Sequence, residues 1–71
     1  HGSVLALSDA GAAAVLAKAA LQAASLNVVI NIGSMDDAER AEGYRNQMED
    51  LLAAGCAMAD EVYADVVKRL S

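Results

Sequence analysis

The stretch that decides the fold is Leu26-Asn27-Val28-Val29-Ile30-Asn31-Ile32-Gly33-Ser34-Met35-Asp36-Asp37. An apolar run, a glycine and a serine-led acidic segment follow one another there, and this order predicts the end of one helix and the start of another. Gly33 suits the left-handed conformation that ends many helices. Ser34 and Asp37 fit the S-x-x-[DE] capping pattern at the start of a helix. We therefore expect a tight turn at 33–34.

The segment before this turn is expected to be helical. Its last part, 26–32, contains several β-branched residues and could suit a short strand. No other segment has strand character, so such a strand would lack partners for its backbone groups. We expect a helix over about 9–32, with Ser8 as its N-cap and Asp9 in its first turn. Its apolar face follows spacings of three and four and comprises Val15, Ala19, Ala23, Leu26 and Ile30.

The segment after the turn predicts a second helix over about 35–70, because it contains neither proline nor an obvious stop signal. Acidic residues near its start and Lys68 and Arg69 near its end suit the helix dipole. A coiled-coil-like stripe runs along it through Ala41, Tyr44, Met48, Leu51, Gly55, Met58 and Val62. A helix of about 35 residues is about 50 Å long, and two helices alone cannot enclose a core. The sequence therefore predicts an all-α fold, an αα-hairpin with a long second helix, completed into an up-and-down helical bundle by oligomerisation or by missing helices.

Composition narrows the classes of function. The 71 residues include 10 Asp and Glu against 5 Lys and Arg, a net charge of −5, which argues against nucleic-acid binding. One cysteine, Cys56, excludes an internal disulfide framework, and His1 is the only histidine, so we expect no metal site. This cysteine usage is compatible with a reducing, cytoplasmic location.

The apolar stretch 4–32 is long enough to raise the question of a membrane span. A span needs about 20 consecutive, predominantly apolar residues. Here the stretch is interrupted by Asp9, Lys18, Gln22, Asn27 and Asn31. We therefore expect no membrane partner.

Few residues could carry chemistry, and no nucleophile with a neighbouring base is present. Asn27 and Asn31 are spaced i, i+4 and share one side of a helix within an apolar run. They could form hydrogen bonds between helices or face a ligand. Asp9, the only carboxylate in the first half of the chain, could stabilise a helix start or orient a cationic or amide-bearing ligand. Cys56 reads as a small buried apolar residue.

Asp9, Asn27 and Asn31 lie within motifs that match a known protein family, and the similarity covers about residues 2–70. The sequence resembles the C-terminal part of the formiminotransferase-cyclodeaminase / methenyltetrahydrofolate cyclohydrolase family, a cyclodeaminase-like domain. The matching motifs are Gly2, the stretch 8–13 (SDAGAA), the stretch 19–21 (AAL), the stretch 26–32 (LNVVINI) and Asp36-Asp37. Ser3 stands where the family commonly has Asn, and Ile32 where it has Leu. The family's glycine-rich entry helix and its Asp-containing motif have no counterpart here.

The resemblance implies a single partial or reduced cyclodeaminase-like helical domain over residues 1–71. It implies a tetrahydrofolate derivative as substrate, without metal, and places Ser8, Asp9, Asn27 and Asn31 in the folate pocket. No catalytic residue is assigned. The family's reactions are hydrolysis of the methenyl bridge and a lyase reaction that releases ammonia. We expect a homodimer, or completion by missing N-terminal helices. The alternative is a dimeric helical interaction module without catalysis, so whether the chain alone is an enzyme stays open.

Overall fold

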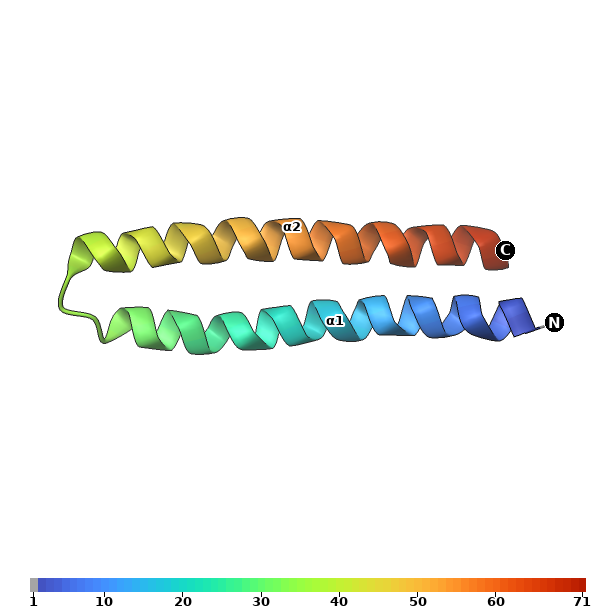
Figure 1. Cartoon of the computed structure of the whole chain (residues 1–71), viewed down its shortest axis with the longest axis horizontal. Helices are drawn as coiled ribbons and strands as arrows, with labels where there is room; N and C mark the ends of the chain where they lie inside the picture. The colour runs from blue at the N-terminus through green and yellow to red at the C-terminus, as the bar shows by residue number, and fades with distance from the viewer. Residues whose placement is uncertain (1) are drawn as a thin grey trace.

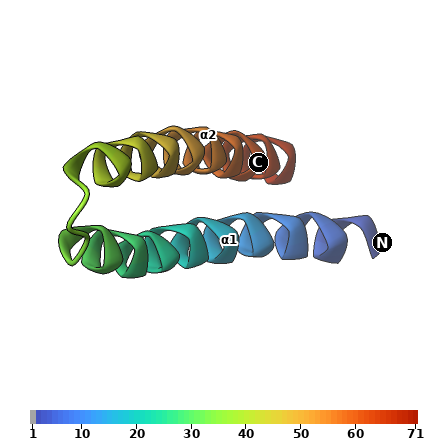
Figure 2. The same ribbon diagram turned by 60° about the vertical axis from the view of Figure 1, so that its left-hand side comes forward.

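The computed structural model describes the backbone of residues 2–71 and the side chains from Val4 onward. Two helices, α1 (Gly2–Gly33) and α2 (Ala38–Leu70), run antiparallel along their whole length and are joined by a short turn (Figure 1). They remain side by side when the molecule is turned (Figure 2). The molecule measures 56 × 15 × 13 Å. The prediction of an all-α hairpin with a long second helix is confirmed.

Helix α1 begins at Gly2, seven residues before the predicted start at Asp9. The segment 4–7 (VLAL) contains good helix formers and no proline, so nothing in it stops the helix from extending toward the N-terminus. Leu7 is also partly buried, which stabilises this added part of α1. Ser8 therefore lies inside the helix, and its predicted role as an N-cap is wrong.

The turn differs from the predicted one at 33–34. Gly33 is the last residue of α1, and no glycine in the described part of the chain has a positive φ. The left-handed stop predicted at Gly33 is therefore wrong. The helix ends instead through tight bonds to its last carbonyls: the Ser34 N–H donates to the Asn31 oxygen at 3.2 Å, and the Met35 N–H donates to the Ile32 oxygen at 3.1 Å.

Helix α2 begins at Ala38, three residues after the predicted start, with Asp37 as its N-cap. The Asp37 carboxylate accepts hydrogen bonds from the backbone N–H groups of Glu39 and Arg40, both at 3.1 Å. Ser34 does not cap α2, because its hydroxyl donates to the Asn31 carbonyl at 2.9 Å.

Loss of this cap should weaken α2. We expect Asp37→Ala to lower the free energy of unfolding by about 1 kcal/mol, because two N–H groups lose their acceptor. Asp36→Ala is the matched control, since the neighbouring exposed carboxylate has no part in the cap. Thermal unfolding followed by circular dichroism at one protein concentration compares the two. Equal losses would show that general charge, not capping, is responsible.

The helices meet along a seam of residues that recur at spacings of three and four. On α1 its members are Leu7, Gly11, Ala14, Lys18, Leu21, Ser25, Val28 and Ile32, and on α2 they are Ala41, Met48, Leu52, Gly55, Ala59 and Val66. The α2 stripe is confirmed in part, at Ala41, Met48 and Gly55. The predicted face of α1 is not the one that packs on α2: Leu26 and Ile30 are 64% and 68% exposed.

Two glycines let the helices approach closely. A Cβ atom at Gly11 would lie 3.1 Å from Val66 Cγ1, and one at Gly55 would lie 2.6 Å from Leu21 Cδ1. Glycine inside a helix costs about 1 kcal/mol relative to alanine. Here the close contact between α1 and α2 offsets that cost.

Very little of the apolar surface is covered by this packing. Among the described side chains only Ala14, Ile32, Ala59 and Val66 form a buried core. The 30-residue segment 4–33 of α1 is long and apolar enough to cross a membrane by length and composition alone. Core helices of soluble proteins and signal sequences pass the same test, but core helices are mostly buried, whereas only 6% of the most apolar part of this segment is buried in the hairpin. A helix that is apolar on all sides is normally covered on all sides.

Candidate functional site

The four predicted folate contacts all lie on α1, and all four side chains are exposed. Ser8 and Asp9 lie near its beginning, and Asn27 and Asn31 lie in its last two turns. Asn27 follows Asp9 by 18 residues, so the two positions are about 27 Å apart along the axis. The hairpin therefore brings Ser8 to Asp9 and Asn27 to Asn31, but it does not bring the two pairs together.

Within this hairpin, Asp9, Asn27 and Asn31 do not take the structural roles considered for them from the sequence. Helix α1 has no acidic residue in its first turn, because Asp9 lies two turns inside it. Asn27 and Asn31 face solvent, so they do not form hydrogen bonds between α1 and α2. Within the described part of the chain, the four side chains make no hydrogen bond. Their polar groups are free to meet a ligand or another chain.

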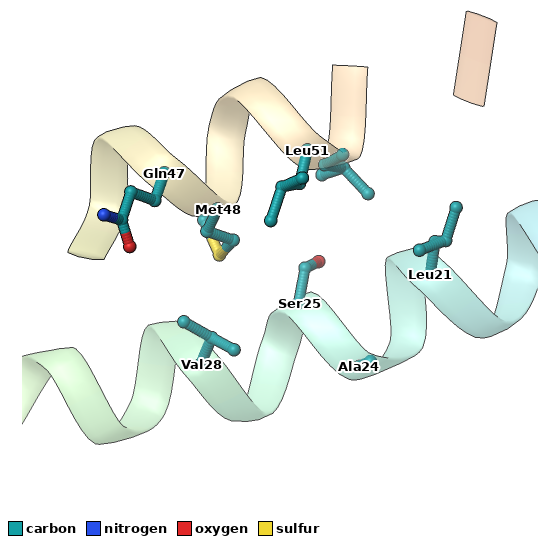
Figure 3. A pocket seen from close by; sticks show the side chains of 8 residues that line it. Leu21, Ala24, Ser25, Val28, Gln47, Met48 and Leu51 are labelled. Carbon is teal, nitrogen blue, oxygen red and sulfur yellow. The ribbon is translucent and has the colours of Figure 1, made fainter. Parts of the chain in front are cut away.

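A groove between the helices was not predicted from the sequence. It encloses about 340 Å³ and is lined by Leu21, Ala24, Ser25 and Val28 from α1 and Gln47, Met48, Leu51 and Leu52 from α2 (Figure 3). The Ser25 hydroxyl at its centre donates to the Gln22 carbonyl at 2.6 Å. A second groove of about 400 Å³ continues past Gly55 toward Val62. None of the four predicted residues lines either groove.

The signal that could have located the groove is a second pattern in α1. Leu21, Ser25 and Val28 follow the same three-and-four spacing as the predicted face, but from a different starting residue. Because alanine is spread over every side of α1, both patterns are apolar and neither stands out.

One ion pair lies in the seam. Lys18 Nζ is 2.8 Å from Asp60 Oδ1, across the middle of the hairpin. The hydrogen bond to the Asp60 carboxylate, together with its charge, raises the pKa of Lys18 above its ordinary value of 10.5. A polar residue at a seam position fixes which residues of two helices lie opposite each other.

This pair predicts a pH dependence. A raised pKa in the folded state means that the pair stabilises the hairpin fully below pH 10.5 and ceases to do so as the pH rises through the higher folded value. We expect helicity to fall in alkaline solution more in the native chain than in Asp60→Asn. The effect is small, because both groups are solvent-exposed. Identical alkaline titrations of the two proteins by circular dichroism would contradict it.

The remaining candidates offer no further site. Cys56 follows the seam residue Gly55 and is half-buried, so the prediction of a buried residue is met only in part. His1 lies outside the described residues. In the part of the chain that the structure describes, no group of His, Cys, Asp or Glu is placed to hold a metal ion.

Fold and site together define a helical hairpin that exposes a carboxylate and two amides on a helix apolar on all sides. The model of the formiminotransferase-cyclodeaminase family matches residues 1–50, a segment that contains all four predicted contacts. The chain belongs to this family, as the resemblance indicated.

A relative supports the same assignment. Over 70 residues, 99% of this chain, the sequence is 36% identical to a methenyltetrahydrofolate cyclohydrolase of Methylorubrum extorquens. The chain spans about one third of that relative, since the match covers 34% of its length. No solved structure matches the chain.

Proposed function

We propose that this chain forms part of a tetrahydrofolate-binding site and serves hydrolysis of the one-carbon bridge of 5,10-methenyltetrahydrofolate. The observation that carries the proposal is the set of four exposed polar residues without partners on the helix that the family model matches. The similarity to a methenyltetrahydrofolate cyclohydrolase favours the hydrolase reaction over the ammonia-releasing lyase reaction.

The chemistry suits these side chains. The methenyl bridge carries a delocalised positive charge, and water adds to its carbon to give the 10-formyl product and a proton. The Asp9 carboxylate is suited to stabilise the cation, and the amides of Asn27 and Asn31 can both donate to and accept from the edge of a pterin ring. The Ser8 hydroxyl lies next to Asp9 and can bind the same ligand. We assign no catalytic acid or base, and the chemistry proposed here involves no metal.

In one hairpin the four proposed contacts form two separate pairs, Ser8 with Asp9 near the start of α1 and Asn27 with Asn31 near its end. We therefore propose a partial or reduced domain whose site is completed outside the single hairpin, by a second copy or by helices beyond this sequence. A cytoplasmic location is part of the proposal, since a reducing compartment keeps Cys56 a free thiol.

The second candidate is a helical interaction module without catalysis. The coiled-coil-like seam and the large exposed apolar surface favour it. If this candidate is correct, the chain self-associates without folate, and Asn27→Ala leaves the absorbance of added folate unchanged.

The proposal is tested with 5,10-methenyltetrahydrofolate and the purified chain, following the absorbance of the ligand. We expect Asp9→Asn and Asn27→Ala each to weaken binding about 10- to 100-fold, the value of one hydrogen bond to a charged group. Asp50→Asn and Asn46→Ala are matched controls, since both residues are equally exposed but lie on α2. Equal effects in sites and controls would overturn the assignment.

A further inference from the structure

The groove of about 340 Å³ lies in the half of the hairpin nearer the turn, and we call it the turn-end groove. Its walls are apolar, but two polar side chains also line it, Ser25 from α1 and Gln47 from α2. Figure 3 shows the Gln47 amide pointing from α2 toward α1. The second groove is lined by apolar residues and glycine alone. Apolar walls with a few polar groups are typical of a small-molecule site, so the turn-end groove is the stronger candidate.

The polar groups of the turn-end groove have hydrogen-bonding capacity that the hairpin does not use. Gln47 is exposed, and its amide makes no hydrogen bond with the residues that the structure describes. The Ser25 hydroxyl donates to the Gln22 carbonyl, which leaves the Ser25 oxygen able to accept. An apolar occupant would cover these groups without giving them partners, which is unfavourable. The groove therefore suits an occupant that is apolar on its faces and polar at its edge.

A second amide lies beside this groove. Gly55 lies against Leu21 across the seam, so seven residues nearer the turn Val28 and Met48 are at about the same level. Asn31 follows Val28 by three residues, and Gln47 precedes Met48 by one. The two amides are therefore about 3 Å apart along the hairpin axis. Residues three or four apart share a side of a helix, so Asn31 stands next to Val28 on the groove side of α1.

We propose that the turn-end groove binds the pterin ring of the folate, with Asn31 at its α1 edge and Gln47 at its α2 edge. This inference rests on the proposed function and adds contacts from α2 to the four on α1. The pyrimidine part of a pterin is flat, and its edge carries an oxo group, a ring N–H and an amino group. A primary amide has one acceptor oxygen and two donor hydrogens, so Asn31 and Gln47 are complementary to that edge. Val28 and Leu51 supply apolar surface for the ring faces.

The two amides are tested with free pterin, whose fluorescence reports binding to the purified chain. We expect saturable binding that Gln47→Leu and Asn31→Leu each weaken about 3- to 10-fold, the value of one hydrogen bond. Leucine is similar in size and favours helix, so a merely structural role of either amide would leave binding unchanged. Asn46→Leu is the matched control, because Asn46 is an exposed amide next to Gln47 that lines neither groove. Equal binding by Gln47→Leu and Asn46→Leu would overturn the proposal.

The apolar wall is tested in the same titration. Leu51 is 72% exposed in the free hairpin and would be covered by the ring, so Leu51→Ala should weaken pterin binding about 10-fold. Leu16→Ala is the control, because Leu16 is 70% exposed but lines neither groove. Both variants should keep the helical circular dichroism signal of the native chain. Equal losses of binding would mean that pterin adheres to apolar surface in general, which would contradict a site in the groove.

Free pterin and 5,10-methenyltetrahydrofolate together separate this inference from the proposed function. Asp9 lies 22 residues before Asn31, about 33 Å along α1, so Asp9→Asn should weaken binding of the folate and leave binding of pterin unchanged. Folate binding that depends on Asp9 but not on Gln47 or Leu51 would overturn the pterin groove alone. Pterin binding that depends on Gln47, without any folate binding, would overturn the proposed function alone. A chain that binds neither ligand would overturn both.

Discussion

The Val66→Asp variant is expected to lose most of its helical signal at concentrations where the native chain is folded. Val66 is 6% exposed and packs where Gly11 brings the two helices into close contact. A carboxylate there must either give up its hydration or force the helices apart, at a cost of several kcal/mol. A hairpin with so small a core has no comparable reserve of stability.

The neighbouring valine is the control. Val67 is 45% exposed on the same turn of α2, so Val67→Asp changes the charge and helix propensity equally without entering the seam. Circular dichroism should show an unfolded Val66→Asp and a folded Val67→Asp. Equal helicity in the two variants would mean that the helices do not meet along the seam described above.

The second large effect is expected from Gly11→Leu. A Cβ atom at this position already lies 3.1 Å from Val66 Cγ1, and the stiff valine side chain has little room to turn. Three further carbon atoms must displace α2, which costs about 1–3 kcal/mol or more. A Cβ atom at Gly43 would meet nothing within 4 Å, so in Gly43→Leu the better helix propensity of leucine should raise stability. Urea unfolding compares them, and a stabilised Gly11→Leu would contradict the close approach.

The type and order of the elements could be predicted because alanine, leucine and the absence of proline all favour helix, with one break near Gly33. The ends could not. Ser34 and Asp37 both have capping side chains, and only the structure shows that Ser34 bonds backward to Asn31 while Asp37 bonds forward to Arg40. We predicted the start of α1 too late because serine is a preferred N-cap residue, and Ser8 fits that pattern although it lies inside the helix.

The packing face of α1 was predicted wrongly for a related reason. Two stripes with the same spacing run along this helix, and nothing local distinguishes them. Which one meets α2 is decided by contacts from a distant part of the chain, such as Lys18 with Asp60 and Leu21 with Gly55. The proximity of Asn27 to Asn31 and the distance of both from Asp9 already follow from helical spacing in the predicted helix over about 9–32.

The most direct test of the central claim, that this hairpin binds a folate, is an equilibrium titration of the native chain with 5,10-methenyltetrahydrofolate. Helicity and mass in solution are recorded on the same sample. We predict saturable binding to the native chain that Asp9→Asn and Asn27→Ala weaken, because both residues are among the four proposed contacts. A chain that is helical and dimeric but leaves the ligand free at every concentration would contradict the claim and favour the interaction module.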